Sequence, residues 1–189
     1  MTTIDRPALM TTEELLSLPE DGMDRELIRG RLRERPMTRR NRRHSRTVAR
    51  LSQLLRNWSD AQPEPHGEVV AGEAGFRIRR NPDTTVGVDL AYISAQLAAT
   101  TPEDAFLIDG SPLLVVEVLA PSDSQEDILE KVRDYIDAGV RLVWVAEPVF
   151  RTVTVYRPDA QPQMYSGNQE LNGDPHLPGF RTPVAEIFG

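Results

Sequence analysis

The stretch Ser111-Pro112-Leu113-Leu114-Val115-Val116-Glu117-Val118-Leu119-Ala120-Pro121-Ser122-Asp123 contains one glutamate inside a run of leucine and valine. A proline stands on each side of that run. A short apolar run bounded by turn residues is typical of a strand buried on both faces. An ionised carboxylate is costly there unless it is paired or binds a metal. Glu117 therefore predicts either an ion pair, for which 21 arginines are available, or a functional site.

Two further stretches supply companions for Glu117. The apolar segment Val86–Ile93 contains a single aspartate, Asp89, and the segment after Pro121 carries Lys131 and Tyr135 one helical turn apart. Two carboxylates on neighbouring strands with a lysine nearby suit metal-assisted hydrolysis of a phosphodiester. The acids would bind Mg²⁺ or Mn²⁺ through oxygen, and the cation would orient water and offset the developing charge.

Lys131 is the only lysine in the chain, against 21 arginines. This bias indicates that arginine is used wherever a plain cation suffices. The surviving lysine then marks a place that needs a compact ammonium rather than a planar guanidinium, although one lysine surviving by chance is compatible with the same count.

Composition narrows the class of protein. A chain of 189 residues with 39% hydrophobic content predicts one domain over residues 1–189, in which residues 1–10 form a loose leader. The absence of cysteine excludes disulfides and thiolate metal sites, and the three histidines are not at zinc-ligand spacing. Without a signal peptide or an apolar run of about 20 residues, we expect a soluble, cytoplasmic protein.

Charge is distributed unevenly along the chain. Residues 25–56 contain twelve arginines and two acids, a formal charge of +10, which leaves −17 for the rest because the whole chain carries −7. Arginines at the start of a helix oppose its dipole, so contact with phosphates is the natural functional interpretation. A solvated helix face and an acidic protein partner remain alternatives. The predicted nucleic-acid-binding residues are Arg39, Arg40, Arg42, Arg43, His44, Arg46 and Arg50.

Hydrophobic periodicity predicts a mixed α/β (α+β) fold. A strand, a helix and a strand between residues 113 and 148 form a βαβ unit, so those two strands should be parallel. The tail from residue 159 should dock as an edge strand and a short helix. The other expected elements are a helix at 10–18, a hairpin at 25–35 around Gly30, a helix at 38–58, strands at 68–71, 75–79, 86–93 and 152–156, and a polar connection at 95–110.

Several motifs, taken in order, resemble the Uma2 family of the PD-(D/E)XK nuclease superfamily. They cover nearly the whole chain. The matching segments are Glu26-Leu27-Ile28 with Gly30 and Leu32, His44-Ser45, Val88–Ile93, Pro112–Asp123, Glu130-Lys131 with Tyr135, Ala138–Val140, Val143–Val145 with Pro148, and Leu177–Phe180.

The resemblance implies a restriction-endonuclease-like core, with a mixed sheet flanked by helices and an N-terminal hairpin and basic helix. It also implies Mg²⁺- or Mn²⁺-dependent cleavage of nucleic acid, with DNA as the expected substrate and pairing into a homodimer. By position, Asp89 and Glu117 would be the metal ligands together with the backbone carbonyl of Val118, and Lys131 would be the catalytic lysine. Glu26, which spacing alone assigns to structure, becomes a catalytic-site acid.

Three positions depart from the superfamily pattern. Val88 replaces the proline before the aspartate, Leu119 replaces the lysine two residues after the glutamate, and Ala120 replaces a serine. The lysine role must then fall to Lys131. The competing hypothesis is a nuclease-fold protein that binds nucleic acid or a protein without cutting, and metal dependence separates the two.

Overall fold

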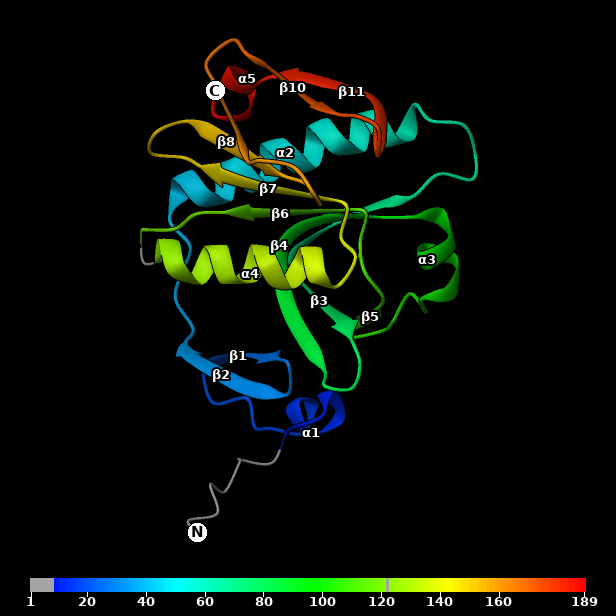
Figure 1. The fold of residues 1–189 in the computed structure, drawn as a ribbon, viewed down its shortest axis with the longest axis vertical. Helices are drawn as coiled ribbons and strands as arrows, with labels where there is room; N and C mark the ends of the chain where they lie inside the picture. The colour runs from blue at the N-terminus through cyan, green and yellow to red at the C-terminus, as the bar shows by residue number, and fades with distance from the viewer. Residues whose placement is uncertain (1–8, 122) are drawn as a thin grey trace.

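The computed structural model describes residues 9–121 and 123–189 (Figure 1). In chain order the elements are α1 (Thr12–Leu16), β1 (Met23–Ile28), β2 (Arg31–Pro36), α2 (Arg42–Asp60), β3 (Glu68–Arg79), β4 (Thr84–Ile93), α3 (Ala95–Thr100), β5 (Ile108–Asp109), β6 (Leu114–Val118), α4 (Gln125–Asp137), β7 (Leu142–Glu147), β8 (Thr152–Tyr156), β9 (Gln163–Ser166), β10 (Glu170–Gly173), β11 (Leu177–Pro183) and α5 (Val184–Ile187).

Nine strands form one mixed sheet. Its main path runs β2-β1-β4-β6-β7-β8-β9, with β3 paired to β4 and β5 paired to β3. β6 and β7 are parallel, as the βαβ interpretation predicted, whereas β4 is antiparallel to β6. The predicted fold class, a mixed central sheet flanked by helices, is confirmed.

The sheet divides along one edge of β4. β3 pairs with β4 along almost its whole length on the other edge. On the dividing edge, Thr85 pairs with Leu27 of β1, and pairing resumes only at Leu90 with Val116 of β6. Among the strand pairs of the described residues, residues 86–89 pair with neither β1 nor β6. They therefore lie where these two strands separate. Asp89 is the last residue of this gap.

Side chains pack on both faces of the sheet. Along β6 and β7, alternate residues point to opposite faces, so Val116 and Trp144 join one core cluster while Val115 and Val143 join the other. The first cluster packs against α2 and the C-terminal elements, and the second packs against α4. The strand around Glu117 is thus buried on both faces, as predicted. Figure 1 shows α4 lying across the strands and the β10–β11 pair at the opposite end from α1.

The N-terminal hairpin forms where Gly30 predicted it. Arg29 and Gly30 both have positive φ, 50° and 76°, which suits a tight two-residue turn between twisted strands. Met10 donates its backbone N–H to the carbonyl of Gly30 at 2.8 Å. The expectation of a loose leader is therefore wrong for residue 10, because this bond attaches it to the turn; residues 1–8 lie outside the described residues.

Three other expectations need correction. The basic helix begins at Arg42 with Asn41 as its cap, so Arg39 and Arg40 precede it. Segments 68–71 and 75–79 form one strand, β3, because Gly72 and Glu73 adopt positive φ in a bulge and the pairing with β4 resumes beyond them. The tail contributes three strands, since β9 extends the main sheet and β10–β11 form a separate pair before α5.

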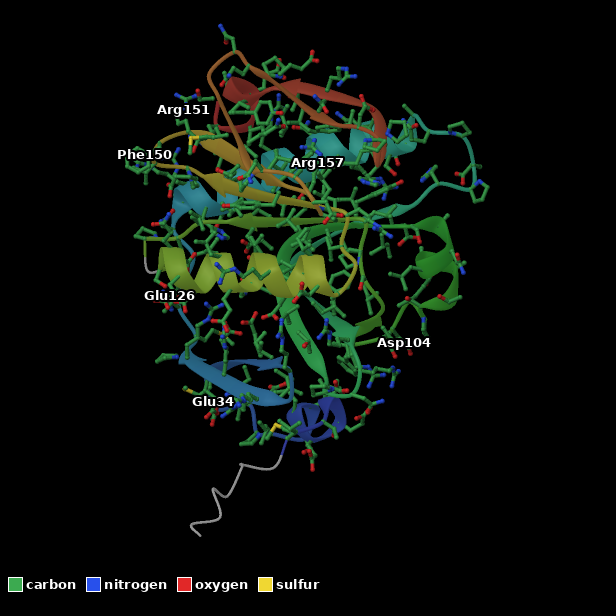
Figure 2. All side chains as sticks on the ribbon, in the orientation of Figure 1. Glu34, Asp104, Glu126, Phe150, Arg151 and Arg157 are labelled. Carbon is green, nitrogen blue, oxygen red and sulfur yellow. The ribbon has the colours of Figure 1, made fainter. Side chains whose placement is uncertain are left out.

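The periphery of the fold carries polar side chains and a few apolar ones. Figure 2 shows Phe150 and Arg151 at the tip of the connection between β7 and β8, where Phe150 is 79% exposed. No helix within residues 9–121 and 123–189 is long and apolar enough to cross a membrane.

Candidate active site

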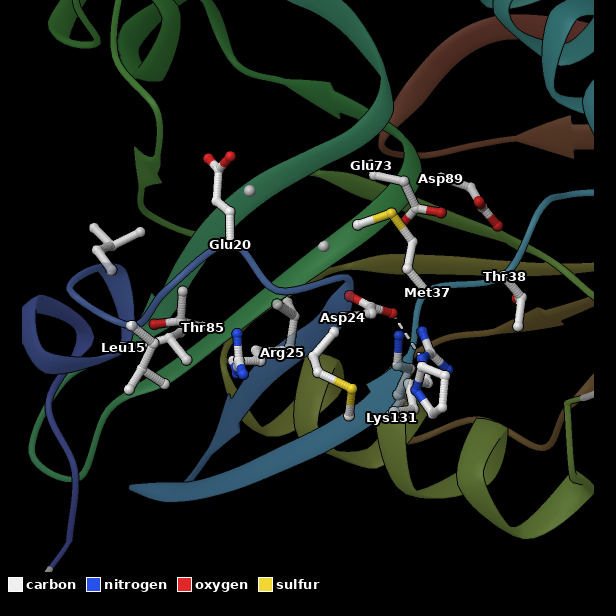
Figure 3. Close-up of a pocket in the computed structure, with 18 of the residues that line it drawn as sticks. Leu15, Glu20, Asp24, Arg25, Met37, Thr38, Glu73, Thr85, Asp89 and Lys131 are labelled. Atoms are coloured by element: carbon white, nitrogen blue, oxygen red, sulfur yellow. Dashed lines mark hydrogen bonds and ion pairs between the residues drawn. The ribbon is translucent and has the colours of Figure 1, made fainter.

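A cleft of about 860 Å³ opens where the sheet divides (Figure 3). Its walls come from α1, the β1–β2 hairpin, β3, β4, β6, α4 and the connection that carries Phe106 and Leu107. Four of the predicted site residues line it together, namely Arg40, Asp89, Glu117 and Lys131. Asp24 and Glu73, which Figure 3 also labels, belong to the same lining.

Asp89 and Glu117 stand on adjacent strands. β4 and β6 pair through Leu90 with Val116, and continuing this register by one residue puts Asp89 opposite Glu117. The backbone N–H of Val118 donates to Asp89 Oδ2 at 2.8 Å, which fixes one carboxylate next to the strand that carries the other. Strand pairing thus brings together two acids that are 28 positions apart in sequence.

Glu117 is buried and closely surrounded. The hydroxyl of Tyr135 donates to its Oε1, and the Lys131 ammonium lies 3.7 Å from the same oxygen. Burial raises the pKa of Glu117 to about 7, against the opposing charge of Lys131 and with a further contribution from the negative charge of Asp89. In the absence of a metal, this carboxyl is therefore protonated in part of the molecules near neutral pH. Burial and the charge of Glu117 raise the pKa of Tyr135, so its hydroxyl keeps its proton and remains a donor.

Lys131 contacts an acid on each of the two strands that separate at the cleft, Glu26 on β1 and Glu117 on β6. Its ammonium lies 2.7 Å from Glu26 Oε1 on β1 as well as 3.7 Å from Glu117, and only 7% of the lysine is exposed. Burial alone would lower the pKa of Lys131, but the charges of Glu117 and Glu26 outweigh it, so the pKa lies above its usual value. The lysine is therefore positively charged at neutral pH. It can orient water or a phosphate oxygen but does not act as a base.

Glu26 reaches the site because the hairpin is fixed to α4. Beside the Glu26–Lys131 pair, Arg33 contacts Glu130 at 2.5 Å and Arg29 contacts Asp134 at 3.0 Å. Glu26 itself is 6% exposed. Sequence spacing alone assigned Glu26 a structural role, because it could not show the contact with Lys131.

His44 lies beside Asp89 and away from the exposed arginines. It is 3% exposed, and its Nε2 is 3.2 Å from the Asp89 carboxylate. Burial would raise the pKa of Asp89, but the hydrogen bonds from His44 and from Val118 N–H outweigh it, so the pKa lies below its usual value. The prediction that His44 contacts nucleic acid is corrected, because the ring is enclosed and its Nε2 is directed at Asp89.

The predicted phosphate-contacting arginines divide into three groups. Arg46 donates to the carbonyl of Phe188 and Arg50 to that of Glu186, so both anchor the C-terminal segment. Arg40 lines the cleft and pairs with Glu73 at 2.7 Å. The remaining three are exposed: Arg42 and Arg43 lie in the first turn of α2, which also carries His44, and Arg39 precedes the helix.

The carboxylates of the cleft are of the kind that binds a hard divalent cation. Mg²⁺ in proteins often uses one or two carboxylates, with waters and substrate phosphates as the other ligands. Asp89 and Glu117 supply two such carboxylates. Among the described residues, no group of three or more His, Asp or Glu side chains is placed to hold a metal by itself. The site therefore fits a hard cation that keeps water and phosphate ligands. The Val118 carbonyl, at the end of β6, stays a predicted further ligand.

The pKa of Glu117 gives a pH prediction for the metal-free protein. A carboxyl with a raised folded-state pKa retains its proton between about pH 4.5 and pH 7, where the unfolded chain has lost it, so stability falls as the pH rises through that window. Relative to Glu117→Gln, the wild type should lose on the order of 2 kcal/mol of unfolding free energy between about pH 5 and about pH 8. Urea unfolding in EDTA measures this difference, and parallel pH profiles for the two proteins would contradict it.

Comparison with known proteins places the chain in a family. Residues 12–185 match the Uma2 family, which is described as "Putative restriction endonuclease". The chain belongs to the Uma2 family. A crystal structure described as "a putative nuclease belonging to DUF820" from Anabaena variabilis ATCC 29413 is similar, with a TM-score of 0.79 and 19% identity over 95% of this chain and 97% of that one. At this identity the likeness shows the fold. The comparison with curated proteins found no significant match.

Membership in the Uma2 family confirms the resemblance, and the structure adds two residues to the site. Tyr135, which was named from the sequence as a helical neighbour of Lys131 and in a family motif but was given no role, bonds to Glu117, and His44 bonds to Asp89. The i, i+4 spacing of Lys131 and Tyr135 was a usable signal, because it puts both on one face of α4. No comparable spacing links His44 to Asp89, which is 45 positions away.

Proposed function

We propose that this chain is a metal-dependent endonuclease that hydrolyses phosphodiester bonds in DNA. The observation that carries the proposal is the meeting of two strand-borne carboxylates with one buried, charged lysine at the division of the sheet. A structural ion pair would explain Lys131 and one acid. It would not explain a third buried acid, since Glu26, Asp89 and Glu117 are all below 10% exposed in the same region.

Each residue of the site has a role in this proposal. Asp89 and Glu117 would hold Mg²⁺ or Mn²⁺, which would supply Lewis-acid stabilisation of the phosphate and lower the pKa of a bound water. Lys131 orients the attacking water and offsets negative charge on the phosphate oxygens. Glu26 holds the lysine in place. Hydrolysis forms a bond from the water oxygen to phosphorus and breaks one backbone P–O bond, and the proton lost by the water is balanced by the proton gained by the leaving oxygen.

Cleavage of supercoiled plasmid tests the proposal. With Mg²⁺ or Mn²⁺ the wild type should convert supercoiled DNA to nicked and linear forms, and EDTA should stop the reaction. Undiminished cleavage in EDTA would contradict the metal requirement. Salt-dependent binding of DNA with no cleavage in either metal would favour the alternative of a nuclease-fold protein that binds without cutting.

The exposed arginines should provide the phosphate contacts. Replacing Arg39, Arg42 and Arg43 together with glutamine should weaken DNA binding and reduce the slope of log K against log salt concentration by about 2–3, since each lost phosphate contact removes about one unit. Fluorescence anisotropy at several salt concentrations measures the slope. The matched control is Arg46→Gln, whose guanidinium already donates to the Phe188 carbonyl and should change the slope by less than about one unit. Equal slopes for the triple variant and the wild type would exclude this surface.

A further inference from the structure

We propose that His44 is a positioning residue, which holds the Asp89 carboxylate in the orientation needed to bind the metal. The inference rests on the proposed function and extends it to a residue outside the set of carboxylates and lysine. It concerns metal affinity and is tested without nucleic acid.

The contacts of Asp89 carry the inference. His44 Nε2 lies 3.2 Å from Oδ1 and 3.2 Å from Oδ2, and Val118 N–H donates to Oδ2 at 2.8 Å. An ionised carboxylate only accepts hydrogen bonds, so the ring nitrogen facing it is the N–H donor. A short aspartate side chain with two fixed donors, one from the backbone and one from a ring, has little freedom to rotate. Asp89 also lines the cleft, so the lone pairs not used by these donors are available to a metal there.

The backbone around His44 makes the donor rigid. The His44 N–H donates to the side chain of the helix cap Asn41 at 3.0 Å, which fixes the first turn of α2. Thr47, Leu51 and Leu55, one or more turns further on, are buried and hold the helix against the sheet. The ring therefore has a defined position relative to β4, as a positioning residue requires.

Other roles suit His44 less well. The ring is 3% exposed, which excludes a direct contact with a phosphate backbone in this conformation. It lies behind Asp89, outside the lining of the cleft, and its Nε2 is already directed at that carboxylate. In metal sites, groups that bond to a ligand from behind orient it, and their loss typically lowers metal affinity by about 10- to 100-fold.

The test compares two substitutions of His44 by calorimetric titration with Mn²⁺ alone. His44→Gln keeps an N–H donor near the position of Nε2, whereas His44→Met has similar bulk and no donor. We expect Mn²⁺ to bind His44→Met at least tenfold more weakly than the wild type and His44→Gln within about threefold of it. Rescue by glutamine separates positioning from a general loss of packing, which both substitutions would cause. Thermal unfolding of each variant confirms that it is folded at the titration temperature.

The other outcomes overturn the inference in distinguishable ways. Wild-type affinity in His44→Met, or equal loss in both variants, overturns the positioning role and leaves the proposed function intact. A wild type that binds no Mn²⁺ overturns both. If His44→Met does not fold, NMR of the wild-type histidine rings during Mg²⁺ titration replaces it. His44 should then shift while His66 and His176 do not, and an unchanged His44 signal would refute its link to the metal site.

Discussion

Replacement of Lys131 by methionine is expected to lower the rate of DNA cleavage by about 10²- to 10⁴-fold, the range typical for a positioned catalytic group. Methionine keeps much of the buried stem and removes the ammonium that contacts Glu26 and Glu117. Since that ammonium opposes a bound cation, Mn²⁺ affinity should stay the same or rise. The experiment therefore measures cleavage rate and Mn²⁺ affinity on the same sample.

Two controls accompany the Lys131 variant. Loss of one partner from a buried ion pair typically costs about 3–5 kcal/mol, so folding must be verified at the assay temperature. Lys131→Arg keeps the charge but has a larger planar head that does not fit a site in which the lysine is only 7% exposed. We expect Lys131→Arg to recover little activity. Cleavage by folded Lys131→Met at the wild-type rate would remove the lysine from the mechanism.

Replacement of Asp89 by asparagine is expected to abolish Mn²⁺ binding and lower metal-dependent cleavage by on the order of 10³-fold, because several kcal/mol of charge stabilisation by the metal are lost. Asparagine preserves volume and can still accept from Val118 N–H through its carbonyl oxygen. The matched control is Asp24→Asn. Asp24 lines the same cleft but pairs with Arg35 at 2.7 Å on the hairpin.

The pair of variants discriminates between a specific site and general acidity of the cleft. Asp24→Asn should retain wild-type metal affinity and activity, since the surface pair with Arg35 contributes little and Asp24 has no contact with Asp89 or Glu117 among the described hydrogen bonds. Similar losses for the two variants would indicate that the cleft binds cations diffusely, which would contradict a defined carboxylate pair.

The sequence predicted the core of the site because its residues break local patterns. Glu117 interrupts an apolar run and Asp89 interrupts another, and both strands are buried where the runs predicted. Lys131 is the single lysine of a chain that has 21 arginines. Such residues are detectable because a buried charge is costly and needs a compensating partner.

The partners themselves depend on tertiary structure. Glu26 sits in an alternating hairpin strand and looks structural until the hairpin docks on α4 and brings it to Lys131. His44 follows a row of arginines, so its local surroundings suggested an exposed basic surface. Its burial results from the packing of α2 through Leu51 and Leu55, which turns His44 inward while Arg42 and Arg43 stay exposed. Local charge therefore did not reveal that His44 is buried, and the contacts of the exposed arginines with phosphates stay a prediction.

Two features of the backbone also escaped prediction. The bulge at Gly72 and Glu73 lies within a single strand that the sequence predicted as two. A glycine in a strand pattern is compatible with either a turn or a bulge, so the sequence does not distinguish them. The sheet divides beside residues 86–89 because β1 and β6 pair with different parts of the same edge of β4. No local pattern encodes that division, although it is what opens the cleft.

Calorimetric titration of Mn²⁺ into the wild type beside Glu117→Ala tests the central claim most directly. The carboxylate pair predicts saturable Mn²⁺ binding by the wild type and its loss in the variant, with plasmid nicking by the wild type in the same buffer. Equal binding by the two folded proteins, or no binding by the wild type even with DNA present, would contradict the assignment of Asp89 and Glu117 as metal ligands.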